Sequence, residues 1–336
     1  MFLNGLITII YVYLIGFIYS LKEFWKDRNE PITVDEVEKK GKQMFQSKNL
    51  VAVVTGSDGQ IGKEIVKHLL QLGYTVCSVG FKNPIVSEKV KHYPTDLSEK
   101  DQVIAAAKQI CSDFSKGIHL VICNAGVMLH PFTLSQVEHI EMHLAVNVLG
   151  HAILVKYLQP ILKLTKNRVI FISSATCRAG SFSKSDINIK QFWKRKLNGY
   201  QAYANSKLLV SIFVEKLAEE EMDKYPKTTF LSVHPGVVPG RLYRYTNFPF
   251  RFLINSFMAP YLRKNKTAAL RILDLAFTSS IQNGAYYEDG KPISVTSKID
   301  PIVRQNLYSL IMKEVENQGF FDSNDDAEMS DIEFID

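Results

Sequence analysis

The sequence has little cysteine, no cluster of basic residues and no internal repeat. Its 336 residues include only 4 cysteines, none in a CxxC pair: Cys77, Cys111, Cys123 and Cys177. We therefore expect no disulfide framework and no metal site, and free thiols are typical of a reducing compartment. The formal net charge is +6, but no stripe of lysine and arginine carries it, so no nucleic-acid partner is expected. A hydrophobic share of 46% excludes a disordered or collagen-like chain.

The charges that are present are unevenly distributed. All 40 basic residues lie before residue 321, whereas the last 16 residues carry seven acids and no base. Such an end is typical of a solvating tail, which we assign to residues 319–336. Phe320 and Phe321 beside these acids resemble a motif that binds receptors of the endoplasmic reticulum. Alternatively, the two rings pack on the domain.

A strongly apolar, uncharged run, residues 2–21, lies near the start of the chain. As a helix it would be roughly 30 Å long, the thickness of a bilayer core. A signal peptide or a core helix is the alternative, but the run lacks the basic start and small-residue end of a signal peptide. We predict a single-pass transmembrane helix at residues 1–22 and a linker at 23–48. The small basic excess after the helix favours a body in the cytosol, on the endoplasmic reticulum or a lipid droplet.

From residue 50 onward, short apolar runs alternate with amphipathic stretches. This pattern predicts one α/β domain at residues 49–318: a doubly wound Rossmann-type parallel sheet with helices on both faces. The first run, residues 50–55, continues into a glycine-rich turn and a helix to about residue 72. Glycines there permit a tight turn and let backbone amides approach a pyrophosphate; a turn without a ligand is the alternative. The predicted cofactor-binding residues are Thr55, Gly56, Ser57, Gly59, Gln60, Ile61 and Gly62.

The second and third strands bear on the choice of cofactor. Strand 75–79 ends in Gly80-Phe81-Lys82-Asn83, which lacks the acid that an NAD site places there. NADP(H) is therefore favoured and NAD(H) remains possible, with Lys82 facing a 2′-phosphate or simply solvated. Asp96, followed by Leu97, is expected to receive the adenine amine or to cap the next helix.

Further motifs, in a fixed order, indicate a family. Thr55-Gly56, Asn124-Ala125-Gly126, Asn147, Ser174 and Tyr203-Ala204-Asn205-Ser206-Lys207 resemble the short-chain dehydrogenase/reductase family over about residues 48–290. The resemblance implies an NAD(P)-dependent enzyme that interconverts an alcohol and a carbonyl. Tyr203 and Lys207 lie four residues apart, so both side chains project from one helix face. A neighbouring ammonium should lower the tyrosine pKa, which is ordinarily near 10.

The resemblance also implies a role for each residue. Tyr203 would exchange a proton with the substrate oxygen, and Lys207 would hold the nicotinamide ribose. Ser174 would hydrogen-bond the substrate oxygen, and Asn147 would hold a water linked to Lys207. The remaining cofactor-binding residues would be Asn124, Ala125, Gly126, Pro235, Gly236 and Val238.

Three positions depart from the family pattern. Gln60 stands in place of the second glycine, Cys123 in place of a frequent asparagine, and Pro239-Gly240 in place of a usual threonine. Proline has no backbone N–H to donate. These departures keep a second interpretation open, a catalytically weak cofactor-binding scaffold at a membrane.

Two variable regions bear on the substrate. Residues 178–199 resemble the insert of the membrane-anchored, retinol-dehydrogenase-like branch of the family. Residues 241–264 interleave aromatic and basic side chains, which suits an apolar substrate and an anionic membrane surface, or else a packed helix with a solvated basic edge. We expect a lipophilic substrate, such as a retinoid, a steroid or a polyprenol/dolichol-like alcohol. The sequence leaves open whether the protein forms a homodimer.

Overall fold

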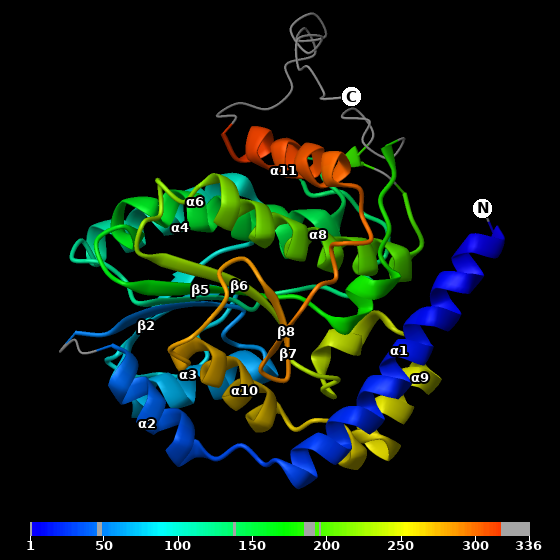
Figure 1. Cartoon of the computed structure of the whole chain (residues 1–336), viewed down its shortest axis with the longest axis horizontal. Coiled ribbons are helices and arrows are strands. Elements are labelled where there is room, and N and C mark those ends of the chain that lie inside the picture. The colour runs from blue at the N-terminus through cyan, green and yellow to red at the C-terminus, as the bar shows by residue number, and fades with distance from the viewer. Residues whose placement is uncertain (1, 46–48, 137–138, 185–191, 195, 317–336) are drawn as a thin grey trace, which may run out of the picture.

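The computed structural model describes residues 2–45, 49–136, 139–184, 192–194 and 196–316. An eight-stranded sheet in the order β3-β2-β1-β4-β5-β6-β7-β8 forms its centre (Figure 1). Neighbouring strands are parallel except for the β7–β8 pair, which is antiparallel. The strands are β1 (Val51–Thr55), β2 (Thr75–Gly80), β3 (Val90–Pro94), β4 (Leu120–Cys123), β5 (Asn167–Ile172), β6 (Thr228–His234), β7 (Tyr286–Glu288) and β8 (Lys291–Ile293).

Helices connect and cover these strands. The long ones are α1 (Phe2–Asn29), α2 (Val34–Met44), α3 (Gln60–Gln71), α4 (Lys100–Asp113), α6 (Gly150–Leu162), α8 (Gly199–Glu220), α10 (Asn265–Phe277) and α11 (Pro301–Glu316). The short ones are α5 (Met142–Leu144), η1 (Ala145–Leu149), η2 (Ala175–Ala179), η4 (Arg241–Tyr245), α9 (Phe248–Phe252), η5 (Leu253–Phe257) and η6 (Ala259–Tyr261).

The helices form a layer on each face of the sheet. Successive side chains of a strand point to opposite faces, so Val51 and Val53 of β1 join one core while Ala52 and Val54 join the other. Helices α4, α6, α8 and α11 pack in the first core, and α2, α3 and α10 pack in the second (Figure 1). The doubly wound parallel fold predicted from the sequence is thus confirmed.

The strand order reverses direction between β1 and β4. β1 pairs with β2 on one side and with β4 on the other, so the connections leave in opposite directions. In open α/β sheets a ligand binds in the crevice at the carboxyl ends of the strands at such a point. The turns that follow β1, β4, β5 and β6 therefore meet where a cofactor site is expected.

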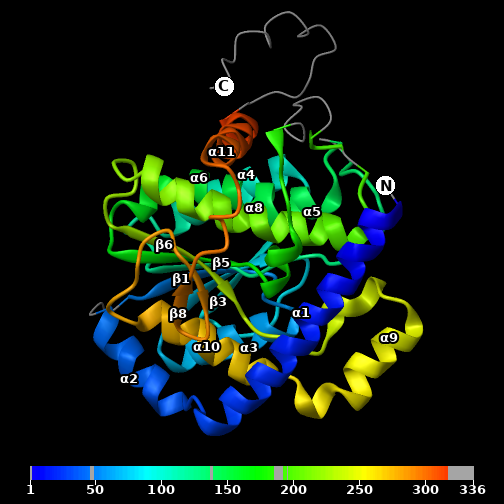
Figure 2. The ribbon, with the colours of Figure 1, turned by 45° about the vertical axis from the view of Figure 1, so that its right-hand side comes forward.

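Two helices in the described part of the chain are long and apolar enough to cross a membrane. The segment Met142–Leu162 is 78% buried and is a core helix, whereas Leu6–Asn29 is only 28% buried. α1 extends past the predicted end of the anchor, residue 22, to Asn29 and lies against the domain (Figures 1 and 2). The predicted linker contains α2, which begins with a capping box between Thr33 and Glu36. The acidic tail with Phe320 and Phe321, and part of the 178–199 insert, lie outside the described residues.

Candidate active site

The turn after β1 is held by Thr55. The Thr55 hydroxyl oxygen accepts hydrogen bonds from the backbone N–H of Asn124 at 2.9 Å and of Ala125 at 3.0 Å. In return, the Asn124 side-chain amide donates to the carbonyls of Thr55 and Gly56. The glycine-rich turn and the Asn124-Ala125-Gly126 turn are therefore locked together, as the shared sheet edge requires.

Two glycines in this turn are required by its geometry. Gly56 has φ +58°, and a Cβ there would lie 2.8 Å from the Cα of Ala125. A Cβ on Gly62 would lie 2.3 Å from the carbonyl oxygen of Gly56. Both close approaches are to backbone, which cannot move aside. The turn leads into the N-terminus of α3, where free backbone N–H groups and the helix dipole favour a phosphate. These residues fit the dinucleotide cofactor that the sequence predicts.

Asn147 lies in the short π-helical segment η1, a departure from α-helix that is frequent at functional sites. Its side-chain oxygen accepts from the backbone N–H of Val127 at 2.9 Å. Its side-chain nitrogen donates to the carbonyl of Val127 and to the hydroxyl of Ser206 at 2.9 Å. Asn147 thus links the turn after β4 to α8. Its contact on α8 is Ser206, the residue next to Lys207.

Lys207 of α8 is buried, and its side chain reaches the end of β5. Its ammonium donates to the carbonyl of Ile172 at 2.8 Å and lies 5.8 Å from the ring centre of Tyr203. Burial disfavours the charged amine and lowers the pKa of Lys207 to about 8. A lysine that is partly neutral near physiological pH can participate in proton movement.

Tyr203 differs from expectation in its ionisation. The sequence predicts a pKa lowered by the neighbouring ammonium, but burial raises the pKa of Tyr203 to about 12, and a hydrogen bond with Ser174 acts in the opposite direction. Desolvation of the phenolate is the largest cause of this shift, and the Ser174 hydrogen bond offsets only part of it. Tyr203 accordingly carries its proton at neutral pH and can act as a general acid.

The two serines after β5 have different partners. The Ser173 hydroxyl donates to the carbonyl of Lys207 at 2.8 Å, so it braces α8 against the strand. Ser174 lies next to Tyr203, and its hydroxyl oxygen accepts hydrogen bonds from the backbone and the hydroxyl of Thr176. The structure thereby places Ser174, rather than Ser173, beside the tyrosine.

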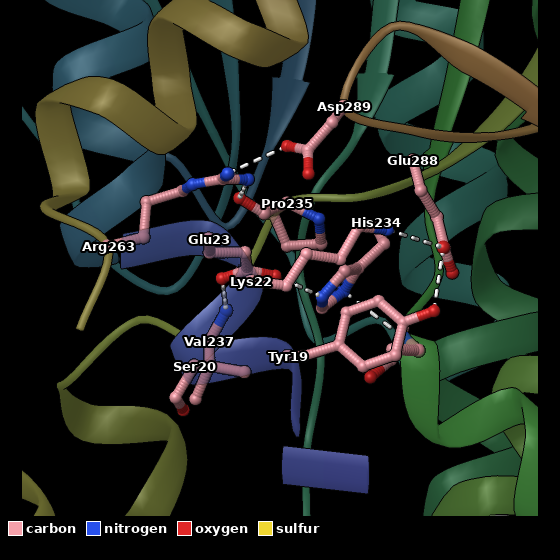
Figure 3. Close-up of polar contacts among 12 residues, drawn as sticks. Tyr19, Ser20, Lys22, Glu23, His234, Pro235, Val237, Arg263, Glu288 and Asp289 are labelled. Atoms are coloured by element: carbon pink, nitrogen blue, oxygen red, sulfur yellow. Dashed lines mark hydrogen bonds and ion pairs between the residues drawn. The ribbon is translucent and has the colours of Figure 1, made fainter. Parts of the chain in front are cut away.

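The turn after β6 is enclosed by buried charges from three segments (Figure 3). The Arg263 guanidinium, 3% exposed, donates to the carbonyl of Pro235 and to the carboxylates of Asp27 and Asp289. Gly236 has φ +109°, and a Cβ there would meet Arg263 at 2.5 Å. Val238 is buried next to this turn. Pro239 has no backbone N–H to donate, but the residues just before it are held by these contacts.

α1 reaches this turn through Glu23, which is 1% exposed. Its carboxylate accepts from the backbone N–H of Val237 at 2.7 Å and from the ring of His234 at 2.9 Å (Figure 3). The other ring nitrogen of His234 accepts from the backbone N–H of Ala175, which follows Ser174. Glu23 therefore connects α1 to the turn after β6 and, through His234, to the turn after β5.

The remaining predicted residues lie around this centre. Lys82 is exposed on the turn after β2, at the same edge of the sheet. Asp96 accepts from the backbone and hydroxyl of Ser98, so one of its oxygens shapes the turn before α4. Leu97 is buried and packs on Gly150, whose Cβ would lie 2.2 Å from the Leu97 carbonyl oxygen. The Gln60 side chain accepts from the backbone N–H of Arg241 and so bridges the glycine-rich turn to the segment after β6.

Several residues of this arrangement are absent from the sequence-based prediction. Glu23 and Arg263 lie in segments that no motif marks, and His234 precedes the predicted Pro235-Gly236 turn without a role assigned to it; the partners of all three lie far away in the chain. His151 pairs with the Thr55 hydroxyl at 2.9 Å, and burial lowers its pKa to about 3, so it is neutral. The buried Cys123 has a raised pKa and is an unreactive thiol. The signal available in the sequence for Glu23 was an acid two residues after the end of an apolar run.

Fold and site together define a nicotinamide-dependent oxidoreductase, and comparison with known proteins agrees. The chain belongs to the short-chain dehydrogenase family, whose "short chain dehydrogenase" profile matches residues 50–186. It falls in the retinol-dehydrogenase-like branch. Mouse retinol dehydrogenase 11 is 30% identical over 254 residues, which cover 71% of this chain and 77% of the relative. Human retinol dehydrogenase 12 is 30% identical, with 72% and 78% covered, and mouse polyprenol dehydrogenase is 29% identical, with 60% and 63% covered.

Solved structures show the same fold. A protein from Mycobacterium paratuberculosis superposes with a TM-score of 0.61 at 21% identity, covering 80% of this chain and 94% of its own. The NADPH-bound carbonyl reductase from chicken fatty liver superposes with a TM-score of 0.53 at 17% identity, covering 74% and 100%. The protein is thus a short-chain dehydrogenase/reductase enzyme that interconverts alcohols and carbonyls and uses NAD(P)(H).

Proposed function

We propose that the protein interconverts an alcohol and a carbonyl on a lipophilic substrate with NADP(H), at a membrane surface. The observation that carries this proposal is the meeting of Tyr203, Lys207, Ser174 and Asn147 beside the glycine-rich turn after β1. A bound nicotinamide cofactor supplies or accepts the hydride. The side chains of this protein then handle the proton and the substrate oxygen.

Tyr203 exchanges the proton with the substrate oxygen. Its raised pKa keeps the phenol protonated at neutral pH, which suits donation to a carbonyl oxygen that gains negative charge during reduction. Ser174, beside the phenol, holds the substrate oxygen by a hydrogen bond. In the oxidation direction Tyr203 first has to lose its own proton, and the phenolate then takes the alcohol proton while Ser174 orients the oxygen.

Lys207 and Asn147 support this proton exchange. Lys207 lies within one helical turn of Tyr203, and its lowered pKa of about 8 lets it gain and lose a proton near neutral pH. We assign to it the cofactor ribose, and to Asn147 a water that links it to solvent. Asn147 stands on a rigid π-helical turn with every side-chain polar atom bonded, so its position is fixed.

Cofactor preference is assigned to the turn after β2. Residues 80–83 contain no acid to bind a ribose hydroxyl pair, and Lys82 is exposed at this edge. A lysine ammonium pairs well with a phosphate as a point charge. NADP(H) is therefore favoured over NAD(H).

The substrate class follows from the segment after β6, residues 241–264, which we term the lid segment. Tyr243 and Ile254 of this segment form a buried apolar cluster with Met128 and Tyr203. The catalytic phenol is thus covered by apolar side chains that exclude water and favour an apolar substrate. The named activities of the relatives, retinol and polyprenol dehydrogenases, involve alcohols of this kind.

We also propose that the body of the enzyme faces the cytosol on the endoplasmic reticulum or a lipid droplet. Supporting this are the uncharged run of α1 and the basic residues that follow it. A lipophilic alcohol or aldehyde partitions into a membrane, so an enzyme held at that surface meets its substrate there.

The proposal is tested by turnover on a panel of lipophilic carbonyls. Purified full-length protein is given NADPH or NADH together with retinal, a steroid ketone or a polyprenal, and cofactor oxidation is followed at 340 nm. We expect turnover on at least one of these carbonyls, faster with NADPH. Tight NADPH binding with no turnover on any member would instead support a catalytically weak scaffold, the alternative that Gln60, Cys123 and Pro239 keep open.

A further inference from the structure

α1 is bonded to the catalytic domain along the length that would have to cross a bilayer. Thr8 donates to Gln201 at 2.7 Å, Tyr13 pairs with Tyr200 at 2.6 Å and Tyr19 donates to Glu288 at 2.7 Å. Further on, Glu23 and Asp27 bind the turn after β6 and Arg263, as described above. Thr8 and Asp27 are 19 residues apart, so this line of contacts extends for roughly 28 Å.

A helix that crosses a bilayer cannot keep these contacts. To span, the segment would have to leave the domain and place the hydroxyls of Tyr13 and Tyr19 in hydrocarbon, where unpaired polar groups are costly. The buried carboxylate of Glu288, which also accepts from Arg178, would lose its hydrogen bond from Tyr19. Glu23 would withdraw from Val237 and His234, leaving a buried N–H donor unsatisfied.

The side of α1 that faces away from the domain is apolar and exposed. Its residues there are large, apolar and between 43% and 61% exposed, and they recur at helical spacing: Leu6, Ile7, Ile10, Tyr11, Leu14, Phe17, Ile18, Leu21 and Trp25. We call these nine side chains the outer face of α1. A helix with one face bonded to protein and one broad apolar face exposed is suited to lie along an interface.

The lid segment extends this apolar surface beside α1. Six of its large apolar side chains are 40% to 69% exposed: Tyr245, Phe248, Phe252, Leu253, Phe257 and Tyr261. Ring contacts join the two elements, Tyr13 with Phe250 at 4.9 Å and Phe24 with Tyr261 at 5.8 Å. Figures 1 and 2 both show α9 beside α1.

The charges around this surface are basic. Residues 241–264 contain no Asp or Glu, and Arg241, Arg244, Arg251 and Lys264 are exposed. Lys22 and Arg28 of α1 are exposed as well. Basic side chains next to apolar ones suit the phosphate layer of an anionic leaflet.

We propose that α1 lies in the plane of the membrane, with its outer face and the lid segment inserted into one leaflet, and does not span the bilayer. This inference rests on the membrane association in the proposed function, and it replaces the single-pass arrangement that the uncharged run predicts. Both ends of α1 then lie on the same side as the catalytic domain. Because only one leaflet is needed, the same arrangement fits a bilayer or the monolayer of a lipid droplet.

Topology distinguishes the two arrangements. A tag with a glycosylation sequon is added, through a flexible linker, before Met1, and a second copy after Asp336, and the protein is made in microsomes. An in-plane helix leaves both tags unglycosylated and both cleavable by protease without detergent. A glycosylated or protected N-terminal tag combined with a cleavable C-terminal tag would overturn the proposal.

Vesicle binding tests which residues insert. Full-length protein is floated with vesicles of phosphatidylcholine and phosphatidylserine, and the bound fraction is measured for Phe17→Glu, Phe252→Glu and the control Met222→Glu. Met222 is 64% exposed in the turn just after α8, outside both apolar surfaces. We expect each phenylalanine variant to bind roughly tenfold more weakly or worse, and the control to bind as the wild type does.

Unchanged flotation of Phe252→Glu would also overturn the proposal, since a spanning α1 alone would hold the protein on the vesicle. Circular dichroism of each variant confirms that it is folded. Neither topology nor flotation measures turnover, so failure of the in-plane arrangement and failure of the proposed reaction are separate results.

Discussion

Replacing Glu23 with glutamine tests whether α1 is part of the cofactor site. The change keeps the size of the side chain but leaves it with one acceptor oxygen. The Ala175 N–H donates to Nδ1 of His234, so the neutral ring carries its proton on Nε2 and donates it to Glu23. Val237 donates its backbone N–H to the other carboxylate oxygen. A glutamine therefore satisfies one of these two donors and turns its NH₂ group toward the other.

The magnitude follows from the lost bond. A buried hydrogen bond to a charged acceptor contributes roughly 1.5–3 kcal/mol, so we expect a total loss of about 2 kcal/mol. This loss divides between the free energy of unfolding and the affinity for cofactor, because Glu23 holds the turn that includes Pro235 and Gly236. If all of it fell on binding, the NADPH Kd would rise about 30-fold.

Two measurements on the full-length protein separate these contributions: urea unfolding and NADPH titration by nucleotide fluorescence. Glu30→Gln is the matched control, because Glu30 lies just beyond α1 and its exposed carboxylate accepts a hydrogen bond from Lys26. We expect Glu23→Gln to fall in stability, affinity or both, and the control to match the wild type. If both quantities stayed at wild-type values in Glu23→Gln, the argument for α1 as part of the site would be refuted.

The other predictions concern the cofactor site and the buried lysine. Lys82→Glu should weaken NADPH binding roughly tenfold and leave NADH binding nearly unchanged; an equal loss of both would contradict contact with the 2′-phosphate. Gly62→Ala should abolish measurable NADPH binding, because the new methyl meets the Gly56 carbonyl; binding within threefold of wild type would show that the turn adapts. The pKa of Lys207 is lowered to about 8 by burial. Between pH 8 and pH 10 this lysine therefore binds more protons in the unfolded protein than in the folded protein. Stability should therefore rise by about 2 kcal/mol over that range relative to Lys207→Met, and parallel urea-unfolding profiles of the two proteins would contradict it. Above pH 10 the raised pKa of Tyr203 acts in the opposite direction, which sets the upper limit of the range.

The sheet and the turn after β1 could be predicted from the sequence because their signals are local. A buried β-branched run followed by spaced glycines predicts a strand and a turn without reference to distant residues. β1 begins one residue after the start of the predicted run, and α3 ends at Gln71, one residue before its predicted end. The spacing of Tyr203 and Lys207 likewise places both on one face of α8.

The environment of those residues could not be predicted in the same way. Whether the pKa of the Tyr203 phenol is raised or lowered depends on how completely α8 is covered, and burial is what raises it here. Glu23 meets partners 211 and 214 residues away, which no local pattern reveals. Gly150 is required by the Leu97 carbonyl of a different segment.

For α1, the sequence predicts a helix but not which side of it faces the domain. The segment Leu6–Asn29 is long and apolar enough to span a membrane by length and composition. A hydropathy average over the run does not show which side of the helix each tyrosine or isoleucine faces. Only the fold shows that Tyr13 and Tyr19 lie on the protein side and Ile7 and Ile18 on the exposed side.

The central claim is that Tyr203 transfers the proton in an NADPH-dependent carbonyl reduction. The direct test is the kcat of Tyr203→Phe on the best lipophilic carbonyl, with NADPH affinity measured on the same preparation. Tyr200→Phe, one turn earlier in α8 and bonded to Tyr13, is the matched control. We predict a loss in kcat of roughly 100-fold or more with NADPH affinity retained in Tyr203→Phe, and near-wild-type turnover in the control. Undiminished kcat in Tyr203→Phe would contradict the account.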